Sequence, residues 1–280
     1  MKLPETIRGI QDTFGLNYRT FLSTNPKTEK NEVTTRILHL VPADLSGSNL
    51  CQGAGNCRRI CLHFAGNPAY FNSKQRARMR RAKLYNEAPQ FFLNFLVLAI
   101  AYEYHNNGGQ LMAVRLNGTS DLPYEDLAFN LSAKVSEFIA RRFGITIAPG
   151  HYDNILQAFQ DLSIKFYDYT KIERDWQKCR ALGYHLTFSF DGYGNKRNHK
   201  ICREAWQNGL NVAAAFNVKK GRDLPAEVYS NLLGIEAPVH DGDLSDYRPN
   251  DPMGRIIGLR FKIPRKATFS GSDVLRFCMC

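Results

Sequence analysis

The sequence lacks several features that would place it in a common protein class. No apolar run reaches the roughly 18 residues that a membrane-spanning helix needs, and Asn94 interrupts the longest apolar stretch, residues 91–102. Residues 1–5 contain no apolar signal-peptide core. A serine-hydrolase elbow, a phosphate-binding loop and a dinucleotide-binding fingerprint are absent in recognisable form. We therefore expect a cytoplasmic protein with no membrane partner.

Acidic residues are missing from one region of this basic chain, whose formal net charge is +11. Residues 51–85 contain no Asp or Glu and eight Lys or Arg. Arg76, Arg80 and Lys83 recur at i, i+4 and i+7 on one side of a helix expected to begin at Lys74. This charge favours nucleic acid, DNA or RNA, as a partner. The expected phosphate contacts are Arg58, Arg59, Lys74, Arg76, Arg80, Arg81 and Lys83. Alternatively, the helix is a solvated face, or its charge offsets an anionic cluster.

The seven cysteines are too unevenly placed for the framework of a secreted disulfide-rich domain. Three of them, Cys51, Cys57 and Cys61, lie within eleven residues. Gly53 and Gly55 lie between them and let the backbone curl, because glycine has no side chain that would clash. Three thiols on such a loop can face one centre, which indicates a metal site.

The chemistry of three clustered thiols leaves three interpretations open. An iron-sulfur cluster prefers cysteine ligands, and three thiolates leave one iron open for an exogenous ligand. A structural zinc site needs a fourth ligand, for which His63 is available although it follows Cys61 by only two residues. The thiols could also bind nothing. Ligand softness and ligand number favour the cluster, so we expect a 4Fe-4S cofactor.

The remaining cysteines have weaker claims to metal. Cys179 and Cys202 fall on expected helices, where cysteine most often packs as a small apolar side chain. Cys278 and Cys280 could fold back as additional ligands, but a frayed tail is the simpler expectation.

Strand-like and helical segments alternate along the chain, which indicates parallel strands with crossover helices. The expected fold class is therefore α/β, with a partial (β/α) barrel of about six parallel strands. We expect a polar N-terminal arm over residues 1–33 and a single domain over residues 34–280. Strands are expected at 36–42, 111–116, 164–169, 185–190, 212–218, 238–240 and 256–261, and helices from 74, from 89, and at 124–142, 151–161, 171–182 and 196–208.

Polar side chains gather where the expected strands end, and ligands of α/β proteins bind at the carboxyl ends of parallel strands. The strand before residue 117 ends in the sequence Asn-Gly-Thr-Ser-Asp, which is dense in ligand-type side chains. Against this, strand-end loops are polar in most proteins. The candidates for orienting a cofactor or substrate are Asn117, Ser120, Asp121, Asp168, Asp191 and Asn217.

With these motifs the chain resembles the phage-encoded gene-product-eighty-eight-like family, a group similar to radical S-adenosylmethionine enzymes. The resemblance covers roughly residues 36–262 and rests on Cys51-x5-Cys57-x3-Cys61 and on residues 114–121, 215–221 and 240–248. It implies a host-cytoplasmic protein with a partial β/α barrel whose three cysteines follow the first strand and bind a 4Fe-4S cluster. In radical enzymes the open iron takes S-adenosylmethionine, and the usual spacing is Cys-x3-Cys-x2-Cys, which is shorter than the spacing here.

Two functions fit these observations. The first is an iron-sulfur protein that engages nucleic acid through the basic segment beside the cluster. The second is a radical-S-adenosylmethionine-like enzyme that modifies a nucleotide or a nucleic acid, with the strand-end residues orienting cofactor and substrate. The sequence predicts neither an oligomeric state nor a catalytic residue.

Overall fold

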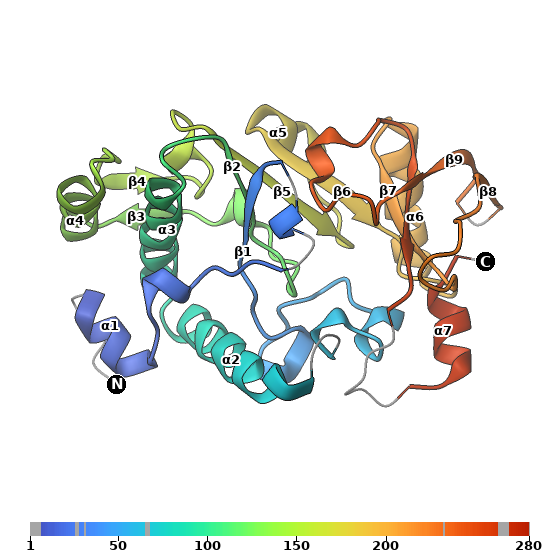
Figure 1. The fold of residues 1–280 in the computed structure, drawn as a ribbon, viewed down its shortest axis with the longest axis horizontal. Helices are drawn as coiled ribbons and strands as arrows, with labels where there is room; N and C mark the ends of the chain where they lie inside the picture. Colours follow the sequence, from blue (N-terminus) through green and yellow to red (C-terminus); the bar gives the residue numbers. More distant parts are fainter. Residues whose placement is uncertain are drawn as a thin grey trace.

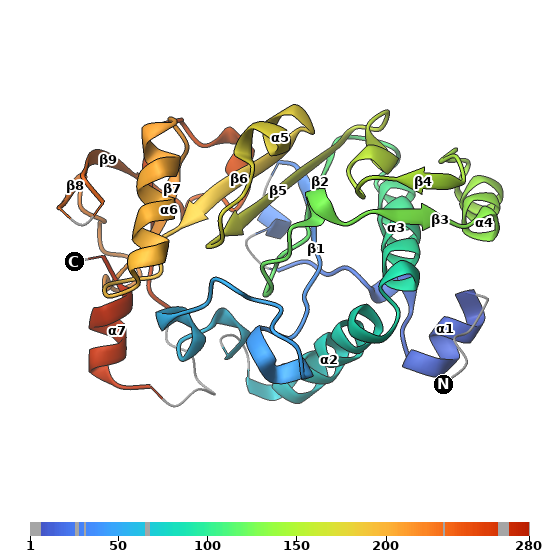
Figure 2. The same ribbon diagram turned by 180° about the vertical axis from the view of Figure 1, so that it is seen from behind.

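The computed structural model describes residues 7–25, 28–30, 32–64, 68–231, 233–262 and 269–279, and an eight-stranded sheet crosses its centre (Figures 1 and 2). The strand order is β1-β2-β5-β6-β7-β10-β9-β8. Six of the seven pairings are parallel, and only β8 with β9 is antiparallel. The strands are β1 Thr34–Ile37, β2 Met112–Arg115, β5 Ile164–Thr170, β6 Tyr184–Ser189, β7 Val212–Phe216, β8 Glu227–Ser230, β9 Ile235–Asp241 and β10 Ile256–Arg260.

Helices connect the parallel strands, and a small antiparallel hairpin lies outside the main sheet. The longest helix, α3, starts with Pro89 in its first turn and is buried along most of its length, as expected for an apolar helix packed against a sheet. The helices are α1 Ile7–Phe14, α2 Phe71–Glu87, α3 Pro89–Asn106, α4 Ala133–Phe143, α5 Trp176–Ala181, α6 Lys196–Gln207 and α7 Gly271–Phe277, and the hairpin strands are β3 Phe129–Leu131 and β4 Gly150–Tyr152.

The predicted α/β class with a mostly parallel sheet is confirmed, but the sheet is not a closed barrel. Strands β1 and β8 stand at opposite ends of the strand order. The seven expected strands each overlap one strand of the main sheet; the eighth, the edge strand β8 that pairs antiparallel with β9, was not predicted. Among the described residues, no helix is long and apolar enough to cross a membrane.

Three predicted helices were wrong in extent or in kind. In place of a helix at 151–161 the chain forms β4 and a single 3-10 turn, Gln157–Phe159. There, Asn154 Oδ1 accepts from the Gln157 backbone N–H at 3.2 Å, and Gln157 Oε1 accepts from the Asp153 backbone N–H at 2.9 Å. Such side-chain acceptors compete with helical hydrogen bonds. The helix predicted at 124–142 begins only at α4, after β3.

The helix predicted at 171–182 is shortened to α5 at its amino end. The Asp175 side chain accepts from the Lys178 backbone N–H and so caps the helix there. Lys171 is held outside it, because its backbone N–H donates to Asp121 Oδ2 at 2.7 Å.

The expected N-terminal arm contributes to the main core. Its buried apolar side chains belong to the same cluster as those of α3. Ser23 also forms an isolated antiparallel bridge with Ile37, which ties this segment to β1. The buried side chains are Phe14, Leu16, Tyr18, Phe21 and Leu22.

The C-terminal tail is packed at residues 278 and 279, which corrects the expectation of a frayed end. Cys278 is 3% exposed and Met279 is 1% exposed. The Met279 backbone N–H donates to the Ala215 carbonyl of β7 at 2.8 Å. Cys280 lies outside the described residues.

The crossover between β9 and β10, residues 242–255, lies against β5 and β6 and buries a charged side chain. Arg248 is fully buried, and its guanidinium lies 2.8 Å from the Asp251 carboxylate. The Tyr167 hydroxyl donates to the Asp246 carbonyl at 2.7 Å. The crossover therefore fixes one face of the sheet with polar contacts.

Candidate functional site

The cysteine loop, residues 50–64, crosses the carboxyl ends of the central strands and lies between α2 and α7 (Figures 1 and 2). Cys51 forms a parallel bridge with Asp121, and the Asp121 backbone N–H donates to the Leu50 carbonyl at 2.8 Å. Cys51 Sγ lies 3.5 Å from the Thr119 carbonyl. The start of the loop is therefore joined to the segment that follows β2.

Asp191, which follows β6, fastens the middle of the loop. Its carboxylate accepts from the backbone N–H of Asn56 at 2.9 Å and from that of Cys57 at 3.1 Å. Asn195 Nδ2 donates to the same carboxylate at 2.8 Å. A side chain at Gly55 would bring its Cβ to 2.4 Å from Asp191 Oδ2, so this close approach requires glycine.

Asp121 joins the ends of β2 and β5. It accepts from the Lys171 backbone N–H at 2.7 Å and from Thr170 Oγ1 at 2.9 Å, and Arg174 Nη1 lies 3.6 Å away. Burial raises the pKa of Asp121, although these three partners partly offset that effect. A Cβ at Gly53 would lie 2.8 Å from the Lys171 backbone, so the loop packs directly on this strand end.

Asp168, Asn117 and Ser120 hold the turn after β2. The Asp168 carboxylate accepts from the Asn117 backbone N–H at 2.9 Å and from the Tyr184 hydroxyl at 2.6 Å, and burial raises its pKa to about 6. Asn117 Oδ1 accepts from Ser120 Oγ at 2.9 Å and from the Leu122 backbone N–H at 2.8 Å. The hydrogen bonds of these side chains are therefore formed within the protein.

The structure therefore brings Asp121 and Asp191 against the cysteine loop and leaves Asn217 apart from it. Asn217 follows β7 and is exposed. Both oxygens of each carboxylate already accept hydrogen bonds: those of Asp191 from backbone N–H groups, and those of Asp121 from the Lys171 backbone N–H and the Thr170 hydroxyl.

The three thiols of the loop are partly buried and form no disulfide. Burial raises the pKa of Cys51 to about 12, and it raises the pKa of Cys57 and of Cys61 as well. The charge of Cys61 adds to the rise of the pKa at both Cys51 and Cys57. Across the described parts of the chain, no three His, Cys, Asp or Glu side chains form a ready metal-holding group.

Lys171 follows β5 and was not among the selected site residues, but its charge acts on this group. Its ammonium donates to Ser189 Oγ at 2.7 Å. Burial lowers its pKa, but Cys57, Asp191 and Asp121 more than offset this, so the pKa is raised overall. Its position directly after β5 was the available signal, because that is where a strand-end residue faces the cysteine loop.

His63, the possible fourth zinc ligand, forms a second contact with Arg78, which was not among the selected site residues. Arg78 Nη1 lies 2.8 Å from His63 Nδ1, and the His63 backbone N–H donates to Cys61 Sγ at 3.4 Å. His63 Nε2 is buried without a hydrogen-bond partner. Burial, and then the charge of Arg78, lower the pKa of His63 to about 4.

The predicted phosphate-binding residues divide into two groups. Several have partners within the protein: Arg81 is 8% exposed and donates to the Thr20 carbonyl at 2.8 Å, Arg58 pairs with Asp44, and Arg59 pairs with Asp273 at 3.3 Å.

The second group lies along the exposed side of α2. Arg76, Arg80 and Lys83 are all exposed, as their spacing predicts. Lys83 approaches Glu87 at 3.8 Å, and Arg80 donates to the Gly15 carbonyl at 3.2 Å. Within the described residues, Lys74 and Arg76 have neither a hydrogen bond nor an ion pair through their side chains.

Comparison with known proteins gives one match. Residues 17–271 match the family described as Gene product 88. No curated protein and no solved structure shows significant similarity to the chain, and the likeness to radical S-adenosylmethionine barrels has no support among these comparisons. Because the match spans most of the sequence and includes all three loop cysteines, the chain belongs to the Gene product 88 family.

Proposed function

We propose that this chain is an iron-sulfur protein in which Cys51, Cys57 and Cys61 ligate a 4Fe-4S cluster and the adjoining basic surface binds nucleic acid. The observation that carries the proposal is the position of three reduced thiols on one short loop, which Asp121 and Asp191 fasten to the strand ends. A cluster bound by three thiolates supplies an iron with an open coordination position.

Three cysteine thiols are suitable ligands for this cofactor, although in the described residues they do not yet surround one point where a metal ion could bind. Buried thiols with raised pKa values are protonated at neutral pH, so metal binding must release protons. Lys171 places a positive charge where thiolates would form. The same thiols with His63, whose Nε2 has no partner, could instead form a Cys3His zinc site.

Metal analysis of protein purified without oxygen separates these two cofactors. Iron and acid-labile sulfide are expected, with both lost in Cys57→Ser. Cys179→Ser is the matched control, because that thiol is buried away from the loop on α5; it should retain both elements. Stoichiometric zinc without sulfide would contradict the cluster and support the zinc site.

Nucleic-acid binding is supported by the exposed side of α2. Arg76 and Arg80 lie one turn apart and have no carboxylate partner among the described residues. Tyr70, at the start of the helix, is 61% exposed and could stack on a base. Contacts of this kind give an affinity that falls with increasing salt, because bound counterions are released from the phosphates.

The test is a salt titration of binding to duplex DNA, single-stranded DNA and RNA. Replacing Arg76 and Arg80 by Ala should weaken binding and reduce the salt dependence. Replacing Lys196 and Lys200 by Ala is the matched control, because these exposed lysines have the same spacing on α6. The nucleic-acid part of the proposal is contradicted if both double variants lose the same affinity, or if the affinity does not change with salt concentration.

The alternative function is a radical-S-adenosylmethionine-like enzyme acting on a nucleotide or nucleic acid. Its specific support is the placement of the cysteine loop at the carboxyl edge of a mostly parallel sheet, where α/β enzymes bind their ligands. Reduced, reconstituted protein should then release 5′-deoxyadenosine from S-adenosylmethionine. An unchanged cluster spectrum and no product would exclude this activity.

A further inference from the structure

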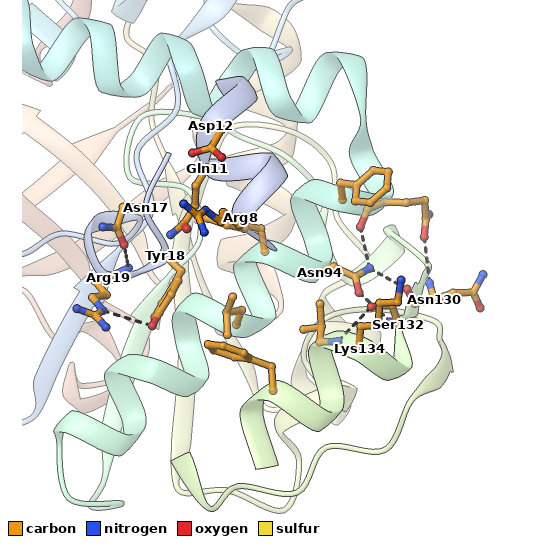
Figure 3. A pocket seen from close by; sticks show the side chains of 16 residues that line it. Arg8, Gln11, Asp12, Asn17, Tyr18, Arg19, Asn94, Asn130, Ser132 and Lys134 are labelled. Atoms are coloured by element: carbon orange, nitrogen blue, oxygen red, sulfur yellow. Dashed lines mark hydrogen bonds between the residues drawn. The ribbon is translucent and has the colours of Figure 1, made fainter. Parts of the chain in front are cut away.

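A second candidate site lies away from the cysteine loop, in a cavity of about 920 Å³ between the N-terminal segment, α3 and α4 (Figure 3). Its volume is in the range of small-molecule sites. In Figure 3, Tyr18 and Arg19 lie on one side of the cavity, and Asn94, Ser132 and Lys134 lie on the other. The apolar wall consists of Tyr18, Phe91, Phe95, Leu98, Val135 and Phe138.

Helical spacing explains why one wall is apolar. Phe91, Phe95 and Leu98 occur at i, i+4 and i+7 of α3, so they share one side of that helix. Phe95 and Leu98 are almost fully buried, whereas Phe91 and Phe138 are partly exposed and form the accessible surface.

Hydrogen bonds of Asn94 fix the distance between the two helical walls. Its Nδ2 donates to the Asn130 carbonyl at 2.8 Å, and its Oδ1 accepts from the Ser132 backbone N–H at 2.8 Å. Ser132 in turn caps α4 by accepting from the Val135 backbone N–H at 3.2 Å. The cavity is thus preformed, and its buried amide is already satisfied.

The rim of the cavity is positively charged. Arg8, Arg19 and Lys134 line it, and Asp12 is the only acidic side chain among its lining residues. Arg19 Nε donates to the Tyr18 hydroxyl at 3.3 Å. Arg8 and Lys134 have no ion pair within the described parts of the chain. An apolar wall below a cationic rim is complementary to a molecule with an apolar body and an anionic end.

We propose that this cavity binds an aliphatic carboxylate of the medium-chain fatty-acid class. The tail packs against Phe91 and Phe138, and the carboxylate lies at the rim near Arg8, Arg19 and Lys134. A heterocycle fits less well, because the side-chain amides of Asn94 and Gln90, two of the polar groups that α3 contributes to the lining, already have hydrogen-bond partners. This inference is independent of the cysteine loop and of the function proposed for it.

Isothermal titration with dodecanoate below its micelle concentration tests the proposal on the full chain. Saturable one-to-one binding is expected, with weaker binding of the uncharged dodecanol and none of AMP. Lys134→Gln should weaken dodecanoate binding about two- to fivefold, the effect typical of one exposed ion pair. Arg141→Gln, on the exposed side of the same helix and outside the cavity, should leave binding unchanged.

A cavity-filling variant, Val135→Trp, should abolish dodecanoate binding while the far-UV circular dichroism remains that of the parent. If that variant does not fold, the Lys134→Gln and Arg141→Gln comparison decides alone. The proposal is overturned if dodecanoate gives no saturable binding, if AMP binds in its place, or if Lys134→Gln binds dodecanoate as tightly as the parent.

Discussion

At the scale of single residues, buried carboxylates near the cysteine loop act as acceptors for backbone N–H groups. Asp191 accepts from the loop itself, Asp121 accepts from the residue after β5, and Asp168 accepts from the turn after β2. A buried charge is tolerated when several donors satisfy it. These acidic residues therefore hold the strand ends and the loop in register.

Replacing Asp191 by Ala should reduce the free energy of unfolding by about 2 to 4 kcal/mol, because buried backbone donors at Asn56 and Cys57 lose a charged acceptor. Urea unfolding measures the change. Asp191→Asn keeps one carbonyl acceptor and should lose less. The exposed Asn217→Ala is the control and should change stability little; a loss there equal to that of Asp191→Ala contradicts the assignment.

His185 should make the protein less stable in acid. Burial, and then Arg248, lower its folded-state pKa to about 4 from 6.5. Between pH 6.5 and pH 4, His185 is therefore protonated in the unfolded chain but still mostly neutral in the folded chain. This removes up to about 3 kcal/mol of stability, and the loss is absent above pH 6.5.

Urea midpoints measured at pH 7 and pH 4.5 test this effect. The drop between the two pH values should be smaller in His185→Gln than in the parent. It should not vanish, because burial also holds the pKa of His39 well below its usual value. An identical drop in both proteins would show that the pKa of His185 is not lowered in the folded state.

At the scale of elements, α2 carries arginines of two kinds. Arg76 and Arg80 lie on its exposed side, whereas Arg81, the next residue after Arg80, lies on the buried side. The Arg81 guanidinium donates to the His39 and Thr20 carbonyls and lies 5.6 Å from the centroid of the Phe21 ring. The Arg81 side chain therefore links α2 to the N-terminal segment, at Thr20, and to the segment that follows β1, at His39.

Arg81→Ala should reduce the free energy of unfolding by about 2 to 3 kcal/mol, since it removes these hydrogen bonds and the ring contact. Arg76→Ala, on the exposed side, should change it by less than about 0.5 kcal/mol. Thermal or urea unfolding of the two variants gives the comparison. Similar losses in both would mean that Arg81 does not tie the N-terminal segment to the core.

At the scale of the whole molecule, the N-terminal segment packs at the edge strand β1, and the C-terminal segment packs at β7 in the interior of the sheet. The N-terminal segment packs on α3 and β1. The C-terminal segment reaches β7 through Met279 and the loop after β6 through Arg276, whose carbonyl accepts from the Tyr193 backbone N–H at 2.6 Å. The candidate site thus depends on distant parts of the chain.

Met279→Ala should lower stability by about 2 to 4 kcal/mol, as expected when a fully buried side chain is truncated in a core. Met279 is 1% exposed, whereas the neighbouring Leu275 is 67% exposed. Leu275→Ala in the same segment should therefore be nearly neutral. Melting temperatures of the two variants check the difference, and a neutral Met279→Ala would mean that the tail is not part of the core.

Local patterns predicted the parallel strands and the apolar helix α3, because their apolar runs directly reflect burial. They could not predict β8, an exposed edge strand, or the turn at 151–161, where side-chain acceptors replace helical hydrogen bonds. The residues around the cysteine loop were partly foreseen from strand ends. Lys171 follows an expected strand and could have been selected, whereas the contact of Arg78 with His63 beside the thiols depends on tertiary packing.

The anchors of the cysteine loop also set the order in which the site can form during synthesis. A ribosome completes Cys51, Cys57 and Cys61 before Asp121 and long before Asp191, which lies 134 residues beyond Cys57. Until Asp191 has emerged, the backbone N–H groups of Asn56 and Cys57 lack the carboxylate that holds the middle of the loop. A nascent chain stalled in this interval would present three reduced thiols to solvent, where oxidation competes with folding.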